Sequence, residues 1–267
     1  MTKPVGNMQP LLTIMQKLRD PQSGCAWDKA QTFQSIVPFT LEEAYEVADT
    51  IERIALDELP DELGDLLFQV VFYCQLGKEQ GMFDFDTVIN RICDKLTRRH
   101  PHVFTDLKSS STDQIKQNWE KIKASERAER EQHSVLDDIP LNLPALSRSM
   151  KIQKRVSRVG FDWPELPPVV AKIHEEIDEV LHEVNQDDID PARVKDEMGD
   201  LLFAVVNLAR HLGVEPEAAL RQANQKFERR FRGVETSAEA NGKPMSEHTL
   251  AELDSYWDQV KRAESDK

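Results

Sequence analysis

Apolar residues recur along this chain with the spacing of amphipathic helices, and no stretch shows the two-residue alternation typical of a strand. A first helix is predicted over residues 9–19, followed by a loop over residues 20–32. Thr40 is then predicted to cap a second helix, LEEAYEVADTIERIA, because it precedes acidic residues that suit a first helical turn. The pattern therefore favours an all-α fold.

Three more helices are predicted in the first half of the chain. They cover about residues 59–80, 85–99 and 113–131, and the last of them contains Trp119. The first of the three is apolar on nearly all sides after its opening residues, which is typical of a helix in a core.

The order of motifs then repeats. Residues 132–146 contain prolines and have no periodicity, so they are predicted to be a linker. Glu62 opens the stretch ELGDLLFQVV, and Glu197 opens the closely similar stretch EMGDLLFAVV. Such an internal repeat predicts two tandem antiparallel helix bundles, covering residues 1–131 and 147–267.

Each half carries two pairs of acidic residues, and the members of each pair lie three residues apart. Positions i and i+3 share a helix face, so four carboxylates converge if the two helices are antiparallel neighbours. Oxygen ligands without His or Cys select hard cations, magnesium or manganese rather than zinc. One such pair is usually a solvated helix face, but its repetition on two helices in both halves favours a metal site. The acidic residues are Glu43, Glu46, Glu62 and Asp65 in the first half, and Glu176, Glu179, Glu197 and Asp200 in the second.

A glycine interrupts each of the two apolar stretches at the same place. Gly64 and Gly199 lie inside strong helical patterns, where Gly is about 1 kcal/mol less favourable than Ala. Close approach of a neighbouring helix or of a ligand would explain why both halves keep it.

Basic residues follow the acidic motifs in each half. Arg offers two parallel donors to a phosphate and Lys a single charge, although compensation of a helix C-terminus is an equal alternative. Trp119 and Trp257 are either nucleobase-stacking or core aromatics. The basic residues are Lys95, Arg98 and Arg99 in the first half, and Lys226, Arg229 and Arg230 in the second.

Composition narrows the class of protein. The 267 residues carry a formal net charge of -14, which argues against a nonspecific nucleic-acid binder but is compatible with a small phosphorylated ligand. Three scattered cysteines do not form a disulfide framework and indicate a reducing compartment. The sequence predicts neither a signal peptide nor an apolar run of membrane-spanning length. We expect a cytoplasmic protein without membrane or nucleic-acid partners.

The two copies of EExxE followed by E-[LM]-G-D-L-L-F, together with the GCAWD loop, resemble the MazG family of nucleoside triphosphate pyrophosphohydrolases. The stretches RRHPHVF, LDDIP, KIQKR, VGFDW and KFERRF extend the resemblance over about residues 9–262. It implies tandem all-α domains, a homodimer, dependence on Mg²⁺ with Mn²⁺ as a substitute, and hydrolysis of NTP or dNTP to NMP and pyrophosphate. A role in cleaning the nucleotide pool would follow.

The resemblance also implies site residues. The metal ligands would be the four acidic residues of the second half, with those of the first half forming a weaker site. Catalysis would use Glu176, a neighbouring Glu175 (or Glu42 in the first half) that orients the attacking water, and Lys226 and Arg230 on the departing pyrophosphate. The implied substrate contacts are Lys172, Glu175, Glu176, Arg193, Lys195, Asp196, Asp200, Lys226, Arg229, Arg230 and Trp257.

Charge predicts which half is the more active. Arg193 and Lys195 precede the second acidic motif, whereas the matching LDELPDE segment of the first half has no cation. We therefore predict that the second domain holds the main catalytic site and that the first is weaker, structural or regulatory.

Two other classes of protein compete with this interpretation. A di-iron or di-manganese carboxylate bundle requires Glu-x-x-His on two helices. Only Glu179 with His182 fits that spacing, because Asp49 stands at the matching position of the first half. A helical nucleotide-sensing or protein-binding module would keep the metal site without turnover, and a regulatory protein partner remains open in either case.

Overall fold

The computed structural model describes residues 7–105, 111, 114–115, 118–119, 122, 125–126 and 134–265. The chain divides into two compact units, Met1–Ser125 and Glu126–Lys267. All regular structure in the described residues is helical, so the all-α prediction is confirmed. No helix in this described part is both long and apolar enough to span a bilayer.

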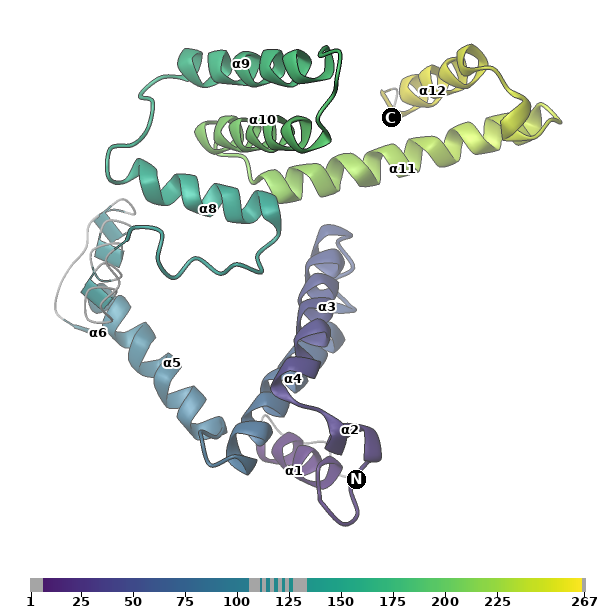
Figure 1. Cartoon of the computed structure of the whole chain (residues 1–267). Coiled ribbons are helices and arrows are strands. Elements are labelled where there is room, and N and C mark those ends of the chain that lie inside the picture. Colours follow the sequence, from purple (N-terminus) through teal and green to yellow (C-terminus); the bar gives the residue numbers. More distant parts are fainter. Residues whose placement is uncertain are drawn as a thin grey trace. The chain divides into compact units, whose positions relative to one another are not determined.

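In the first unit, α3 and α4 form a long antiparallel pair, and α1 packs against α4 (Figure 1). The core lies between these helices and contains Met15, Ile36 and Phe72, with further aromatic side chains packed around it. The helices of this unit are α1 (Gln9–Leu18), α2 (Ala26–Ala30), α3 (Phe33–Glu52), α4 (Leu59–Glu79), α5 (Phe85–Arg99) and α6 (Pro101–Phe104).

The predicted cap of α3 is wrong. The helix begins eight positions earlier than Thr40 would place it, because Thr32 and Ser35 cap it reciprocally: each side chain accepts a hydrogen bond from the other's backbone N–H. Thr40 lies inside the helix, and its hydroxyl donates to the Ile36 carbonyl at 3.1 Å. The predicted loop over residues 20–32 likewise contains the short helix α2.

In the second unit, α9 and α10 form the matching antiparallel pair, and α8 packs against α10 (Figure 1). The long helix α11 packs mainly against α12, which folds back along it. The helices of this unit are α8 (Ala145–Ser157), α9 (Leu166–Val184), α10 (Pro191–His211), α11 (Pro216–Ala240), the 3-10 turn η1 (Met245–Glu247) and α12 (Leu250–Ser265).

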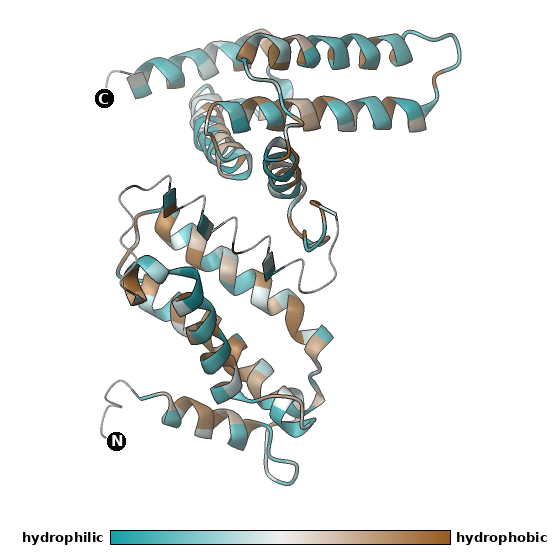
Figure 2. Ribbon diagram, turned by 90° about the vertical axis from the view of Figure 1, so that its left-hand side faces the viewer, coloured by the Kyte–Doolittle hydropathy of each residue, from teal (hydrophilic) through white to brown (hydrophobic). Residues whose placement is uncertain are grey.

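The helices at the centre of each unit are not buried on all sides, contrary to the expectation for so apolar a sequence. Hydrophobic and hydrophilic residues alternate along the helices in Figure 2. Exposed apolar side chains recur at helical spacing on α10, at Met198, Leu202 and Val205. Gly64 and Gly199 belong to these open faces, because a Cβ at either would meet nothing within 4 Å. Close approach of a neighbouring helix therefore does not explain these glycines.

Two predicted segments lie partly outside the described residues. Of the predicted helix 113–131, the structure describes residues 114–115, 118–119, 122 and 125–126, and all of these are helical. The predicted linker 132–146 begins outside the described part. Its residues 134–144 form turns that lead into α8.

Candidate active site

Three carboxylates of the second unit meet between α9 and α10. Glu176 and Glu179 lie one turn apart on α9, and Glu197 faces them from α10; each offers an oxygen within 4.8 Å of the others. The antiparallel packing of two helices with i, i+3 acidic pairs produces this convergence, which the sequence predicts for these three residues and for Asp200. Asp200 lies one turn beyond Glu197 and lines a cavity together with Glu176.

Lys172 neutralises part of this acidic group. Its Nζ lies 2.7 Å from Glu176 Oε1 and 2.8 Å from Glu175 Oε1, one turn before them on α9. These hydrogen bonds raise the pKa of Lys172. The pKa of Glu179 is also raised, first by its hydrogen bond with Glu176 and then by burial and the charge of Glu176. Glu175 and Glu176 therefore share one lysine.

Glu176 is the most enclosed member of the group, with 4% of its surface exposed. Among the described residues, no hydrogen-bond partner reaches its buried Oε2 atom. A buried carboxylate oxygen without a donor or a cation is strongly unfavourable. The oxygen-only donor set, the crowding of like charges and this unpaired oxygen all fit a hard divalent cation.

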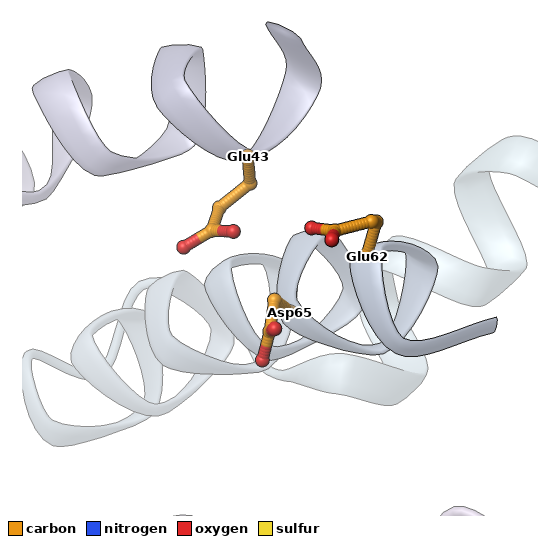
Figure 3. Close-up of side chains that lie close together, drawn as sticks. All are labelled: Glu43, Glu62 and Asp65. Atoms are coloured by element: carbon orange, nitrogen blue, oxygen red, sulfur yellow. The ribbon is translucent and has the colours of Figure 1, made fainter. Parts of the chain in front are cut away.

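The first unit repeats the acidic group without the lysine. Glu43 on α3 points towards Glu62 and Asp65 on α4, with oxygens within 4.8 Å of one another (Figure 3). The pKa of Glu43 is raised by burial and by the charges of Glu46 and Asp65. The pKa of Glu62 is raised by the same three causes. Phe39 occupies the position that Lys172 holds in the second unit, four residues before the central glutamate. The described residues place no ion pair on these carboxylates.

The predicted phosphate-binding cations lie elsewhere in the single chain. Arg193 donates to Glu183 at 2.6 Å, and Arg229 and Arg230 both donate to Glu264, at 2.8 Å and 2.7 Å. Lys226, Lys195 and Asp196 are solvent-exposed. Their contact with substrate stays a prediction.

The interpretation of the second-half cations as residues near a helix end is wrong. Because α11 continues to Ala240, Lys226 and Arg230 lie in its middle, whereas Arg98 and Arg99 do end α5. Trp257 packs against Phe227 on α11, with ring centroids 5.1 Å apart, and Arg230 lies over its ring.

A cavity of about 550 Å³ opens beside the acidic group of the second unit. Glu176, Asp200 and Lys172 line it together with the aromatic residues Phe161 and Trp163. Sequence reasoning missed this cavity. The available signal was the GFDW loop, in which two large aromatic residues stand beside a glycine before the acidic helix.

Comparisons with known proteins agree on one family. The family model described as the MazG nucleotide pyrophosphohydrolase domain matches residues 31–104 and 168–234, once in each unit. The nucleoside triphosphate pyrophosphohydrolase of Escherichia coli K12 is 58% identical over 256 residues, which cover 96% of this chain and 97% of that protein. The nucleoside triphosphate pyrophosphohydrolase/pyrophosphatase MazG of Thermotoga maritima is 43% identical, with 95% of each chain covered. The uncharacterized protein YabN of Bacillus subtilis is 41% identical over 94% of this chain and 51% of its own length.

Proposed function

Since this chain belongs to the MazG nucleotide pyrophosphohydrolase family, we propose that it hydrolyses nucleoside triphosphates to nucleoside monophosphate and pyrophosphate at the acidic group of its second unit. One observation carries the proposal: Glu176, Glu179 and Glu197 converge beside a cavity that Lys172 and Asp200 also line. Acidic ligands at the edge of a nucleotide-sized cavity suit a phosphate ester held through a divalent cation.

Glu176, Glu179, Glu197 and Asp200 would hold Mg²⁺, and Mn²⁺ would suit the same oxygen ligands. When bound, the metal would neutralise charge on the phosphate oxygens and make a water molecule more nucleophilic. The unpaired Oε2 of Glu176 and the raised pKa of Glu179 support this ligand set.

The side chains around the metal ligands have separate roles in this proposal. Lys172 is placed to exchange its contact with Glu176 for a phosphate oxygen. Glu175 lies next to the ligand pair, half exposed, where it can orient the attacking water and accept its proton. Lys226, Arg229 and Arg230 would balance the charge of the departing pyrophosphate.

The second unit is proposed as the main site for two reasons. Lys172 stands there where the first unit has Phe39, and a cavity adjoins the acidic group of the second unit. A triphosphate in the first unit would meet like-charged carboxylates without the matching lysine. The first unit would then bind a cation weakly, or serve a structural or regulatory role.

Product analysis with a panel of NTPs and dNTPs tests the proposal. Wild type, Glu176→Gln and the matched first-unit variant Glu43→Gln are assayed with and without Mg²⁺. We expect NMP and pyrophosphate in the wild type, loss without metal, and a fall of at least about 100-fold in kcat for Glu176→Gln. Release of phosphate and NDP would refute the reaction class, and loss in Glu43→Gln alone would move the site to the first unit. Nucleotide binding without turnover would favour a sensing module.

A homodimer is the assembly that the open helix faces favour. Ile177, Leu181 and Val184 are exposed on α9 at i, i+4 and i+7. The same spacing recurs on α10, as described above, and on α4 at Leu63, Leu67 and Val70. An apolar stripe on each central helix pair is typical of helices that continue a bundle with another copy. The free cysteines agree with the reducing cytoplasm in which we place the protein.

A further inference from the structure

Charged residues continue beyond the acidic group along the facing sides of α9 and α10. On α9, Glu176, Glu179 and Glu183 follow one another at spacings of three and four residues, so they share one helix face. On α10, Arg193 precedes Glu197 by four residues and shares its face in the same way. Because the two helices run antiparallel (Figure 1), Arg193 meets the last of the α9 carboxylates: its Nη2 donates to Glu183 Oε1 at 2.6 Å.

The acidic group thus lies between two cations, Lys172 at one end of the α9 face and Arg193 at the other. The Arg193 side chain is 64% exposed, whereas that of its partner Glu183 is only 5% exposed. Within the part of the chain that the structure describes, Glu183 is the one residue that the guanidinium contacts. An arginine carries five N–H donors, so several of them are available to a ligand at this end of the acidic group.

Stability does not explain why Glu183 is placed here. Burial of a carboxylate is unfavourable, and replacement of a buried ion pair by apolar side chains of similar volume is often neutral or stabilising. Arg193 is also placed unfavourably, because it lies in the first turn of α10, where the helix dipole disfavours a cation. Two residues that each reduce stability, and that contact each other beside a metal-type site, are better explained by a role in ligand binding.

The first unit does without this ion pair. Counted from the acidic residues of each helix, Thr50 stands at the position of Glu183, and Glu58 stands at that of Arg193. Thr50 is buried as well, but its hydroxyl donates to the Glu46 carbonyl of its own helix at 2.8 Å. The first unit thus fills the same buried position without a charge. The ion pair accompanies the unit that we propose as the main catalytic site.

We propose that Glu183 is a positioning residue for the phosphate chain of the substrate: it holds the Arg193 guanidinium at the end of the acidic group, where the remaining N–H groups bind phosphate oxygens. This inference rests on the proposed function. A guanidinium presents donors on more than one edge, so one edge stays on Glu183 while another meets the phosphate. Without Glu183 the exposed arginine side chain would have to be ordered at each binding event, which lowers affinity.

Two uncharged replacements of similar size isolate the hydrogen bond to Arg193. Glu183→Gln keeps an acceptor, whereas Glu183→Met fills the same volume without one, and both remove the same charge. Calorimetric titration with the α,β-methylene analogue of ATP and Mg²⁺ measures binding without cleavage. We expect Kd to rise by roughly five-fold to ten-fold in Glu183→Met and by less than about two-fold in Glu183→Gln. Glu252→Met, which removes the carboxylate of an exposed ion pair with Lys243 in the same unit, should leave Kd unchanged.

Two further readouts separate positioning from a merely structural role. The Tm of Glu183→Met should equal or exceed that of wild type, so that affinity falls while stability does not. In an Arg193→Gln background, Gln and Met at position 183 should give the same Kd, because the residue acts through Arg193.

Three results would overturn the proposal: equal Kd values for Glu183→Gln and Glu183→Met, a difference between them that persists without Arg193, or tighter binding in Glu183→Met, which would mean that Glu183 competes with the phosphate. None of these readouts needs turnover. A wild type that binds the analogue but releases no pyrophosphate from NTP would therefore refute the proposed function and leave the role of Glu183 in binding intact.

Discussion

Replacing Lys172 by Met tests whether the acidic group of the second unit is arranged for a cation. Lys172 is the lysine that pairs with both Glu175 and Glu176, and its side chain is 35% exposed while that of Glu176 is 5% exposed. Truncating one partner of a fully buried ion pair destabilises by about 3–5 kcal/mol, whereas exposed pairs contribute about 0–1 kcal/mol. The intermediate burial of this pair places the expected loss at about 2 kcal/mol.

Thermal unfolding in EDTA and in excess Mg²⁺ gives the readout. A loss of about 2 kcal/mol lowers the Tm of a unit of this size by about 4–8 °C. In Mg²⁺ the difference from wild type should shrink, because a bound cation replaces the charge that the substitution removes. Glu175→Gln, which alters the more exposed partner, should shift the Tm by no more than about 2 °C. An equal Tm loss for Lys172→Met with and without Mg²⁺ would refute a cation-binding role for the group.

Three further predictions concern the core, an ion pair and the assembly. Phe72→Ala should lower the free energy of unfolding by about 3–5 kcal/mol in urea titrations, against no more than about 0.5 kcal/mol for the exposed Met82→Ala; similar values would contradict the core assignment. Arg229 and Arg230 lower the pKa of Glu264 to about 2 from 4.5, so its stabilising effect is present above about pH 4.5 and is lost as pH falls towards 2. Melts of Glu264→Gln should therefore lie below wild type at pH 7 and converge with it near pH 2. Leu202→Glu should convert a dimer to a monomer in light scattering while Leu250→Glu does not, and a wild-type monomer would exclude the proposed assembly.

The helices that the sequence predicted best are those with strong local signals. The bounds of α4 and α5 agree with the prediction within about a residue because Gly81, with φ of +67°, ends one helix and Asp84 caps the next. The start of α3 was misplaced because Thr40 before two glutamates imitates a cap. The true cap is Thr32, which exchanges hydrogen bonds with Ser35. Thr32 and Thr40 are competing candidates for the cap within one segment.

The convergence of the acidic residues could be predicted because it needs only helical spacing and antiparallel neighbours. Of the four carboxylates expected to converge in each half, three come together: Glu176, Glu179 and Glu197 in the second, and Glu43, Glu62 and Asp65 in the first. The counter-charges could not be predicted in the same way. A long basic side chain can reach several partners, and tertiary packing decides which one it contacts. Arg193 contacts Glu183 and Arg230 contacts Glu264 for this reason.

The sequence by itself determined the helical class, the two-fold repeat and the acidic metal-type ligands, because each follows from periodicity and from short-range spacing. Only the tertiary structure decided that a cavity adjoins the acidic group of the second unit. The cavity depends on which side chains from separate helices face the same volume, such as Gln153 on α8 and Asn207 on α10. Packing between elements far apart in the chain leaves no periodic signal, and so the sequence alone does not show it.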